Sequence, residues 1–205
     1  ANMKRLLLAL TLMLSLPTMV LADNVLIFGD YEYGAKPFLE TELVALGHTV
    51  TNVAALPVDV SGYDTIWHVG AFVPLTDDEQ LRLADFLASG GGLHLTGERP
   101  CCEALNDSLQ AFVNSVVVGG TVQVGDLGDI NGPYAINPAA HGGLASTPNA
   151  VSAWMPQASG GMGGLGSLPS ANILTTGAGD VPTGGAWIAS ELVSAAGRMT
   201  LLVDV

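Results

Sequence analysis

Two adjacent cysteines, Cys101 and Cys102, carry the most reactive side chains in the sequence, and the chain contains no other cysteine. A bond between neighbours would be strained, because their Cα atoms lie only about 3.8 Å apart. Two reduced thiols, a strained redox-active disulfide and a bond to another chain remain as alternatives. If a helix N-terminus lowers the pKa of one thiol and His141 or His68 acts as its base, the pair could serve a cysteine-dependent hydrolase or a thiol-redox protein.

The other residues with metal-binding or acid–base chemistry give weaker patterns. The histidines form no HExxH motif and no CxxC pair accompanies them, so we expect no metal site; the alternative is a soft-metal site of Cys101, Cys102 and His141, if the fold brings them together. Asp126, Asp129 and Asn131 offer oxygen ligands, but their spacing departs from a calcium-binding loop and indicates a turn. Glu32 and Glu98 could act as acid and base on a sugar, with two solvated carboxylates as the simpler interpretation. No P-loop or GxSxG motif occurs and no GxGxxG follows the first predicted strand, so we expect no cofactor.

The elements that must position these residues follow a β/α pattern. Short apolar runs predict buried strands at 24–29, 48–53, 64–70 and 93–97. Helices are predicted from Pro37 to a glycine cap at Gly47, from the capping box Thr76–Glu79, and over 105–116, where apolar side chains repeat at helical spacing. This order predicts an α/β fold, a three-layer flavodoxin-like parallel sheet with helices on both faces and strand order 2-1-3-4.

The composition changes over residues 119–186, where glycine is frequent and Lys and Arg are absent. We expect this glycine-rich C-terminal part to add loops and extra short strands to the sheet. The stretch 159–169 predicts a mobile surface loop, with a tightly turned structural loop as the alternative. Further strands are expected at 171–176, 187–193 and 199–205, with a helix over 186–195 as the alternative to the second of them.

Residues 1–22 have the features of an export signal. Two basic residues precede an apolar run over 6–16, and small side chains suit cleavage after Ala22. The apolar run is too short to span a bilayer. We therefore expect an exported, periplasmic or extracellular protein with no membrane segment after cleavage and a single domain over residues 23–205. Because the sequence ends within an apolar strand, we also expect this domain to be truncated at its C-terminus.

The charge of the chain excludes one class of partner. Six basic residues stand against nineteen acidic ones, giving a formal charge of −13. Such a chain lacks the electrostatic attraction to a phosphate backbone, so nucleic acid is not an expected partner. With 49% hydrophobic and 12% charged residues, the sequence is too apolar for a disordered protein.

Three segments of the sequence resemble a known superfamily. They are NVLIFGDYEYG (24–34), PVDVSGYDTIWHVG (57–70) and LTDDEQLRLADFLASGGGLHLTGE (75–98). Together they are similar to the class I glutamine amidotransferase-like superfamily, and closest to its ThuA-like and related non-amidotransferase branches. The resemblance covers about residues 24–117 and the late GRMTLLVD segment. In active amidotransferases the turn after strand four carries a Gly-x-Cys-x-Gly elbow, whereas here it reads TGERPCC (96–102), which puts glutaminase activity in doubt.

Open parallel sheets bind ligands outside the carboxyl ends of their strands, which gives a candidate binding edge. The candidate residues, in the loops after strands one, three and four, are Asp30, Tyr31, Glu32, Phe72, Glu98 and Arg99. We expect a non-catalytic domain that contacts a small polar ligand, such as a carbohydrate, or a partner protein at this edge. The alternative is the cysteine-dependent hydrolase or redox protein, with Cys101, Cys102 and His141 as catalytic residues. Whether the chain is an enzyme, and its oligomeric state, stay open.

Overall fold

The computed structural model describes residues 22–31, 34–144, 151, 153, 156, 159–163 and 168–203. The predicted export signal up to residue 21, the candidate Glu32 and the end of the predicted last strand lie outside these residues. In chain order the elements are β1 (Asn24–Phe28), α2 (Ala35–Ala45), β2 (Thr49–Asn52), β3 (Thr65–His68), α3 (Asp77–Ala88), β4 (Gly92–Gly97), a 3-10 helix (Pro100–Cys102), α4 (Glu103–Val116), β5 (Gln123–Ile130), β6 (Ala135–Ile136), a 3-10 helix (Ala140–Gly142), β7 (Ser159–Gly163), β8 (Ile173–Thr176), a 3-10 helix (Ala178–Asp180), β9 (Pro182–Trp187), a 3-10 helix (Ala189–Glu191) and β10 (Arg198–Val203). No helix in the described part is both long enough and apolar enough to cross a bilayer.

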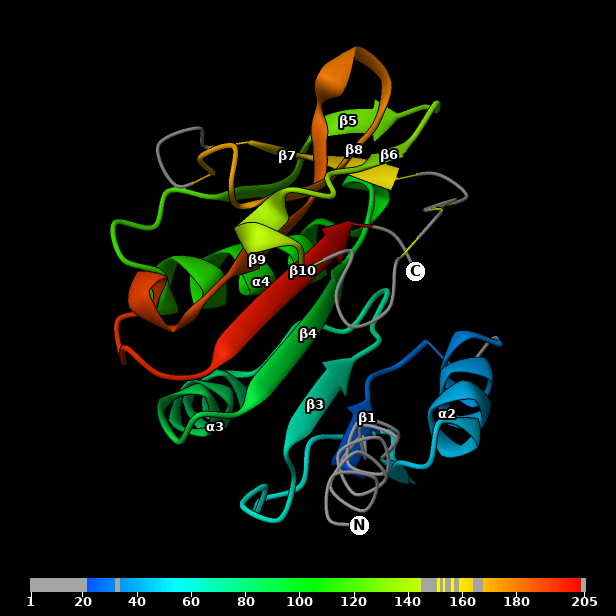
Figure 1. Ribbon diagram of the computed structural model, residues 1–205, viewed down its shortest axis with the longest axis vertical. Helices are drawn as coiled ribbons and strands as arrows, with labels where there is room; N and C mark the ends of the chain where they lie inside the picture. Colours follow the sequence, from blue (N-terminus) through cyan, green and yellow to red (C-terminus); the bar gives the residue numbers. More distant parts are fainter. Residues whose placement is uncertain are drawn as a thin grey trace, which may run out of the picture.

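The strands of the described residues form one large sheet and one small ribbon (Figure 1). The sheet has the order β2-β1-β3-β4-β10-β9-β8-β6. The first five strands are parallel, and β9, β8 and β6 each pair antiparallel with the strand before them in this order. Strands β5 and β7 pair antiparallel with each other. This arrangement confirms the predicted α/β fold, the strand order 2-1-3-4 and the extra strands in the glycine-rich part.

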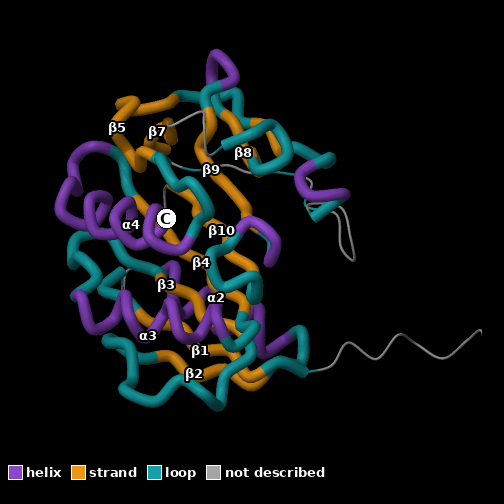
Figure 2. Tube along the Cα trace, turned by 90° about the vertical axis from the view of Figure 1, so that its left-hand side faces the viewer, coloured by secondary structure: helices purple, strands orange, loops and turns teal. Residues whose placement is uncertain are grey.

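Alternating side chains give the two faces of the sheet separate cores. On one face Leu26, Ile66 and Leu95 are fully buried in the larger core, which α3 and α4 cover. On the opposite face Ile27 packs with Leu43 of α2 in a smaller core. Figures 1 and 2 show α3 and α4 together on one side of the sheet and α2 on the other. The helices thus lie on both faces, as the sequence predicts.

The helices α3 and α4 form where their local signals predict them. Thr76 caps α3 by accepting a hydrogen bond from the backbone N–H of Glu79, while the Glu79 carboxylate accepts one from the Thr76 N–H at 2.9 Å. In α4 the predicted apolar face is buried, with Leu105, Leu109 and Phe112 all at 0% exposure. Both predictions are confirmed.

The helix α2 departs from its predicted packing. It begins two residues before Pro37 and ends before Gly47, which has the expected left-handed conformation with φ of 94°. The predicted apolar face is only partly buried, because Leu46 is 66% exposed, whereas Lys36 is 1% exposed. The helix presents Lys36 to the sheet, where its ammonium group satisfies carbonyl groups at the ends of two strands.

The C-terminal half differs from the prediction in two places. The segment predicted as a strand at 187–193 is mostly a 3-10 helix and loop, and the strand paired with β10 is the preceding β9. Residues 159–163 form the buried strand β7, so this part of the predicted mobile loop is wrong. Glycine-rich strands have few side chains to indicate burial, and their pairing with distant segments leaves no local pattern.

The aspartate-containing segment after α4 is also a strand rather than only a turn. β5 pairs with β7 at both of its ends, and its register shifts between Val124 and Asp129. The residues between these two pairs leave the ladder as a bulge. Asp126 and Asp129 are exposed there and form no metal-binding cluster with other described residues.

Candidate functional site

The loops that follow β1, β3 and β4 meet at the carboxyl edge of the parallel strands, as predicted. Asp30 follows β1, and its carboxylate accepts hydrogen bonds from the backbone N–H groups of Ala71 at 2.9 Å, Phe72 at 3.0 Å and Val73 at 3.3 Å. Asp30 therefore fixes the loop after β3. Phe72 itself is 65% exposed on this loop.

Tyr31, the next candidate, also takes part in the structure of this edge. Its backbone N–H donates to the Val69 carbonyl at 3.2 Å, and its half-buried side chain packs on the smaller core. Lys36 adds a third connection, because its ammonium donates to the carbonyls of Gly29 at 2.9 Å and Val53 at 2.8 Å. These contacts tie the ends of β1, β2 and β3 together.

A cavity of about 140 Å³ lies beside these contacts, on the face of the sheet that carries α3. Its walls come from the ends of β1 and β3, from the segments after β2 and β3, and from the first turn of α3. Among its polar lining groups are Asp30, His68 and Glu79. Ala54 and Ala55 also line it and are exposed, so the cavity reaches the surface. It is smaller than most ligand pockets, which suits a small ligand.

His68 is the unusual group on the wall of this cavity. The residue is 2% exposed, and its Nδ1 atom has no hydrogen-bond partner among the described residues. Burial lowers the pKa of His68 to about 4, although the negative charge of Asp30 acts to raise it. The Thr96 backbone also interacts with the ring and opposes this lowering of the pKa. The Nδ1 atom itself is enclosed by protein.

The turn between β4 and α4 forms the second part of the edge. Asn106, only 3% exposed, reaches back from the first turns of α4 to the backbone of this turn. Its Oδ1 accepts from the Glu98 N–H at 2.9 Å, and its Nδ2 donates to the carbonyls of Glu98 at 2.7 Å and Arg99 at 3.4 Å. One side chain therefore satisfies the backbone groups that follow the end of β4.

The ribbon of β5 and β7 lies against the same turn. A Cβ atom at Gly160 of β7 would lie 2.9 Å from the Glu98 carbonyl oxygen and 2.7 Å from a methyl group of Val203. A Cβ atom at Gly125 of β5 would lie 2.3 Å from the Asn106 amide nitrogen. Both positions require glycine because backbone passes so close to the turn. In addition, the Ser159 hydroxyl donates to the Val203 carbonyl at the end of β10.

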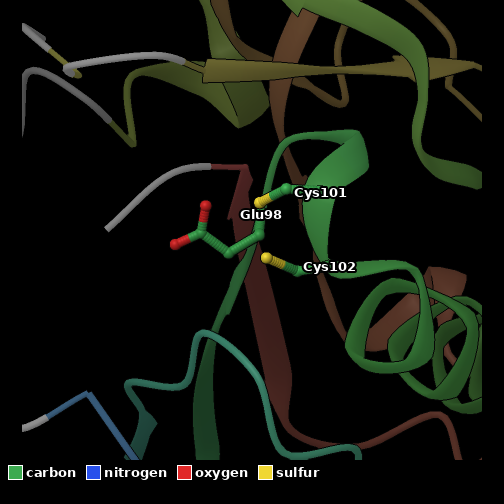
Figure 3. Close-up of side chains that lie close together, drawn as sticks. All are labelled: Glu98, Cys101 and Cys102. Atoms are coloured by element: carbon green, nitrogen blue, oxygen red, sulfur yellow. The ribbon is translucent and has the colours of Figure 1, made fainter.

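The side chains of this turn bring two thiols and a carboxylate together (Figure 3). The Sγ atoms of Cys101 and Cys102 and a carboxylate oxygen of Glu98 all lie within 4.8 Å of one another. Both cysteines are free thiols, with Cys101 exposed and Cys102 buried. Glu98 is 9% exposed and Arg99 lies at the exposed side of the turn. The two thiols therefore do lie at the end of β4, although the cysteine elbow of amidotransferases is absent.

The electrostatics of Cys102 do not suit a nucleophile. Cys102 caps the N-terminus of α4, a position that usually lowers a thiol pKa. Here burial raises the pKa of Cys102 to about 12, and the neighbouring Cys101 and Glu98 act in the same direction. Hydrogen bonding to Cys101, together with the charge of Asp129, raises the pKa of the exposed Arg99.

The structure does not bring His141 together with the cysteines. Its Nε2 lies 2.9 Å from the Ala186 carbonyl oxygen and 3.2 Å from the Glu191 carboxylate. Both regions pair with β10, at different positions. Ala186 lies opposite Thr200, whereas Gly97 at the end of β4 lies opposite Val203. These two positions are three residues, or about 10 Å, apart along β10. His141 instead connects its own loop to the end of β9. His68, the other candidate base, lies on the cavity wall and interacts with Asp30, Glu79 and the Thr96 backbone, not with either thiol. Neither candidate imidazole is therefore placed to activate a cysteine.

The roles of three residues of this edge were not predicted from the sequence, although His68 was named as a possible base for the thiols. Asn106 could have been suspected, because a polar residue next to Leu105 interrupts the apolar pattern of α4. Lys36 gave no signal, since a lysine in a first helical turn is usually solvated. The unpaired Nδ1 of His68 depends on tertiary packing that no local pattern encodes.

Comparisons with known proteins support the fold. No protein-family model and no curated protein sequence matches the chain. Among solved structures, an mmIFT52 N-terminal domain is similar with a TM-score of 0.54 and 12% identity, covering 88% of this chain and 86% of that domain. A ThuA-like protein from Bacteroides uniformis is similar with a TM-score of 0.50 and 13% identity, covering 87% and 80%. At these identities the likeness concerns the fold alone.

Proposed function

We propose that this chain is an exported ThuA-like domain that binds a small, neutral, hydroxylated ligand, of the size of a monosaccharide, at the carboxyl edge of its sheet. The binding site is the cavity between the ends of β1 and β3. The observation that carries the proposal is the surface-reaching cavity itself, whose polar lining includes Asp30, Glu79 and the buried His68. Export is proposed on the pattern of residues 1–22, and the ThuA-like assignment on the fold of the Bacteroides uniformis protein.

The position of the cavity in the fold supports a binding role. β1 continues through α2 to β2 on one side, and the chain then crosses to β3 on the other side of β1. The loops that leave β1 and β3 therefore diverge, and ligands of open α/β sheets bind at such a switch point. The hydrogen bonds of Asp30 to the loop after β3 hold one wall of the cavity in place.

The polar groups of the cavity select the chemistry of the ligand. His68 is neutral at pH 7 because burial lowers its pKa to about 4, so it brings no positive charge to the cavity. Asp30 and Glu79 contribute carboxylate oxygens, which are hydrogen-bond acceptors. A ligand with several hydroxyl donors satisfies these groups, while an anionic ligand is repelled by the two carboxylates. The apolar wall, which includes Phe28 and Leu75, suits the C–H face of a small sugar.

The turn after β4 supports a domain without glutaminase activity. The residue that directly follows β4 is Glu98, a carboxylate, and the nearest thiols come three and four residues later. The contacts of His141 lie at the end of β9. A thiol with a raised pKa and no neighbouring imidazole lacks the activation that acyl transfer needs.

Thermal unfolding with a panel of neutral monosaccharides and polyols tests the proposal, with gluconate as an anionic comparison. A ligand present at about 100 times its Kd stabilises the folded state by about 2.7 kcal/mol, or roughly 5–10 °C in Tm for a domain of this size. We expect such a shift with at least one neutral compound and none with gluconate.

Two variants and one control locate the binding. Ala55→Leu fills the mouth of the cavity, and His68→Gln replaces the imidazole ring on its wall, so both should abolish the ligand-induced shift. Ala45→Leu makes the same change as the first variant at an exposed position of α2 and should keep the shift. No stabilisation by any compound of the panel, or equal stabilisation of wild type and Ala55→Leu, contradicts the proposed site.

A further inference from the structure

The side-chain cluster of Glu98, Cys101 and Cys102 makes a second, separate site at the same edge. Among the described residues it is the one group of three or more Asp, Glu, His or Cys side chains whose ligand atoms converge. We propose that these three residues bind a thiophilic divalent cation of the zinc class, with two thiolates and one carboxylate as ligands. This role goes beyond the proposed sugar binding and does not depend on it.

The distances in the cluster are close to those of a coordination sphere. With bonds of about 2.3 Å to sulfur and 2.0 Å to oxygen, tetrahedral geometry places neighbouring ligand atoms roughly 3.5–3.8 Å apart. The observed separations are at most 4.8 Å, so movements of about 1 Å, within reach of side-chain rotation, complete the geometry. Figure 3 shows both sulfur atoms directed from the start of α4 toward the Glu98 side chain.

The backbone of the turn is organised before any ion binds. Asn106 fixes the Glu98 and Arg99 peptide groups with three hydrogen bonds, and the close approach of Gly160 covers them from the ribbon. Adjacent cysteines rarely direct both sulfurs to one point, but the short 3-10 helix Pro100–Cys102 that leads into α4 does so here. Rigid support of this kind is what holds metal ligands in a productive arrangement.

The charges and the ligand types favour a zinc-class ion. Two thiolates and one carboxylate carry −3, which a divalent cation and the neighbouring Arg99 guanidinium together neutralise. Arg99 hydrogen-bonds to Cys101, where its positive charge would stabilise the metal-bound thiolate. A hard cation such as Mg²⁺ prefers oxygen ligands, and Cu(I) prefers an all-sulfur site, whereas zinc accepts both. Three protein ligands leave the fourth position to water or an external ligand, as in exchangeable zinc sites.

Binding of the ion is a balanced exchange of protons for metal. The two thiols bind as thiolates, so two protons pass to the buffer for each ion bound, and the Glu98 carboxylate joins without releasing a proton. The sulfur atoms are not oxidised. Calorimetry of Zn²⁺ binding in buffers with different ionisation enthalpies measures this proton release directly.

The experiment uses the full chain, reduced and freed of metal by a chelator. We expect one Zn²⁺ per chain, release of about two protons per ion as balanced above, and protection of both thiols from iodoacetamide. Co²⁺ in place of zinc should give the near-ultraviolet charge-transfer absorption of cobalt–thiolate bonds. Cys101→Ser, at an exposed position, should weaken binding by more than the ~10–100-fold that is typical for loss of a group that only hydrogen-bonds to a metal ligand.

The controls separate this site from other outcomes. Glu98→Gln should weaken binding, while Glu103→Gln, at an exposed carboxylate in the first turn of α4, should leave it unchanged. Circular dichroism establishes that each variant is folded. The proposal is overturned if the reduced chain binds no Zn²⁺ or if Cys101→Ser binds it as well as the wild type. It is also overturned if the two cysteines form a disulfide that zinc does not prevent. Sugar-induced stabilisation, measured separately, is unaffected by these variants.

Discussion

Replacement of Asn106 by alanine tests whether a single side chain organises the turn after β4. The change removes three hydrogen bonds to the Glu98 and Arg99 backbone. Two of them are short, at 2.9 and 2.7 Å, and the third is longer, at 3.4 Å. With Asn106 only 3% exposed, water does not easily replace the lost partners. A buried polar group that loses its partner costs about 1–3 kcal/mol, so we expect Asn106→Ala to cost about 3 kcal/mol.

Asn114 on the same helix provides a matched control. Its amide makes an equivalent pair of hydrogen bonds with the backbone of Val122, at 2.9 and 2.7 Å, but the side chain is half-buried. Water can hydrate the freed groups there, and we expect Asn114→Ala to cost only about 1 kcal/mol. Urea unfolding followed by tryptophan fluorescence measures both values, and the m-value should stay unchanged. The difference corresponds to roughly 4–8 °C in Tm.

Asn106→Asp adds a pH-dependent test of the same contacts. The ionised carboxylate still accepts from the Glu98 N–H, but its other oxygen faces a carbonyl group to which the amide donated. Burial and this contact raise the pKa of the new carboxyl in the folded state, so the loss of stability is full at neutral pH and shrinks as the pH falls through that pKa.

If Asn106→Ala and Asn114→Ala lower the free energy of unfolding equally, or if Asn106→Ala lowers it by less than about 1 kcal/mol, the organising role of Asn106 is refuted.

Three further predictions concern stability. Gly160→Ala would place a Cβ atom 2.7–3.0 Å from three heavy atoms of facing segments, and should cost more than about 2 kcal/mol, whereas Gly62→Ala, in open space, should be nearly neutral in the same urea titration. Lys36→Met removes two hydrogen bonds from a buried ammonium and should lower the free energy of unfolding by about 2–3 kcal/mol, measured by chemical denaturation. Burial lowers the pKa of His68 to about 4 and of His94 to about 3, from 6.5, so the unfolded chain binds more protons below pH 6.5 and stability falls as the pH decreases. At pH 5 each histidine should lower the free energy of unfolding by about 2 kcal/mol relative to neutral pH. His94→Gln should therefore flatten the dependence of the free energy of unfolding on pH, and an unchanged slope would contradict the burial argument.

Elements with strong local signals were predictable from the sequence. The capping box at Thr76 fixes where α3 begins, and the spacing of Leu105, Leu109 and Phe112 identifies the buried face of α4. Short apolar runs identified the first four strands, and the rules for crossover connections then gave their order. These features depend on interactions within a few residues or on the general handedness of the fold.

Features that depend on distant partners were not predictable. β7 is a strand because it pairs with β5 across some thirty residues, and its glycines reveal neither face nor period. Lys36 is buried because two strand ends present carbonyl groups to it, which only the assembled sheet does.

The candidate site was predicted in place but not in detail. The edge itself followed from the parallel order of the strands, and Glu98, Cys101 and Cys102 do meet there. The hydrogen bonds of Asp30 to the loop after β3 could not be foreseen, because they depend on how that loop folds back. His141 lies elsewhere because its ring binds the Ala186 carbonyl near the end of β9, a contact between segments that are distant in the sequence.

The support of the turn after β4 has a consequence for how such a domain can change during evolution. The contacts that shape this turn use its peptide groups, which Asn106 and the glycines of the neighbouring ribbon hold from outside. The exposed side chains of Arg99 and Cys101 take no part in these contacts, whereas Glu98 is largely buried. A lineage can therefore exchange residues 99 and 101, and with them the reactivity of this edge, with little effect on the contacts that shape the turn. The same property makes these two positions a suitable target for a combinatorial library.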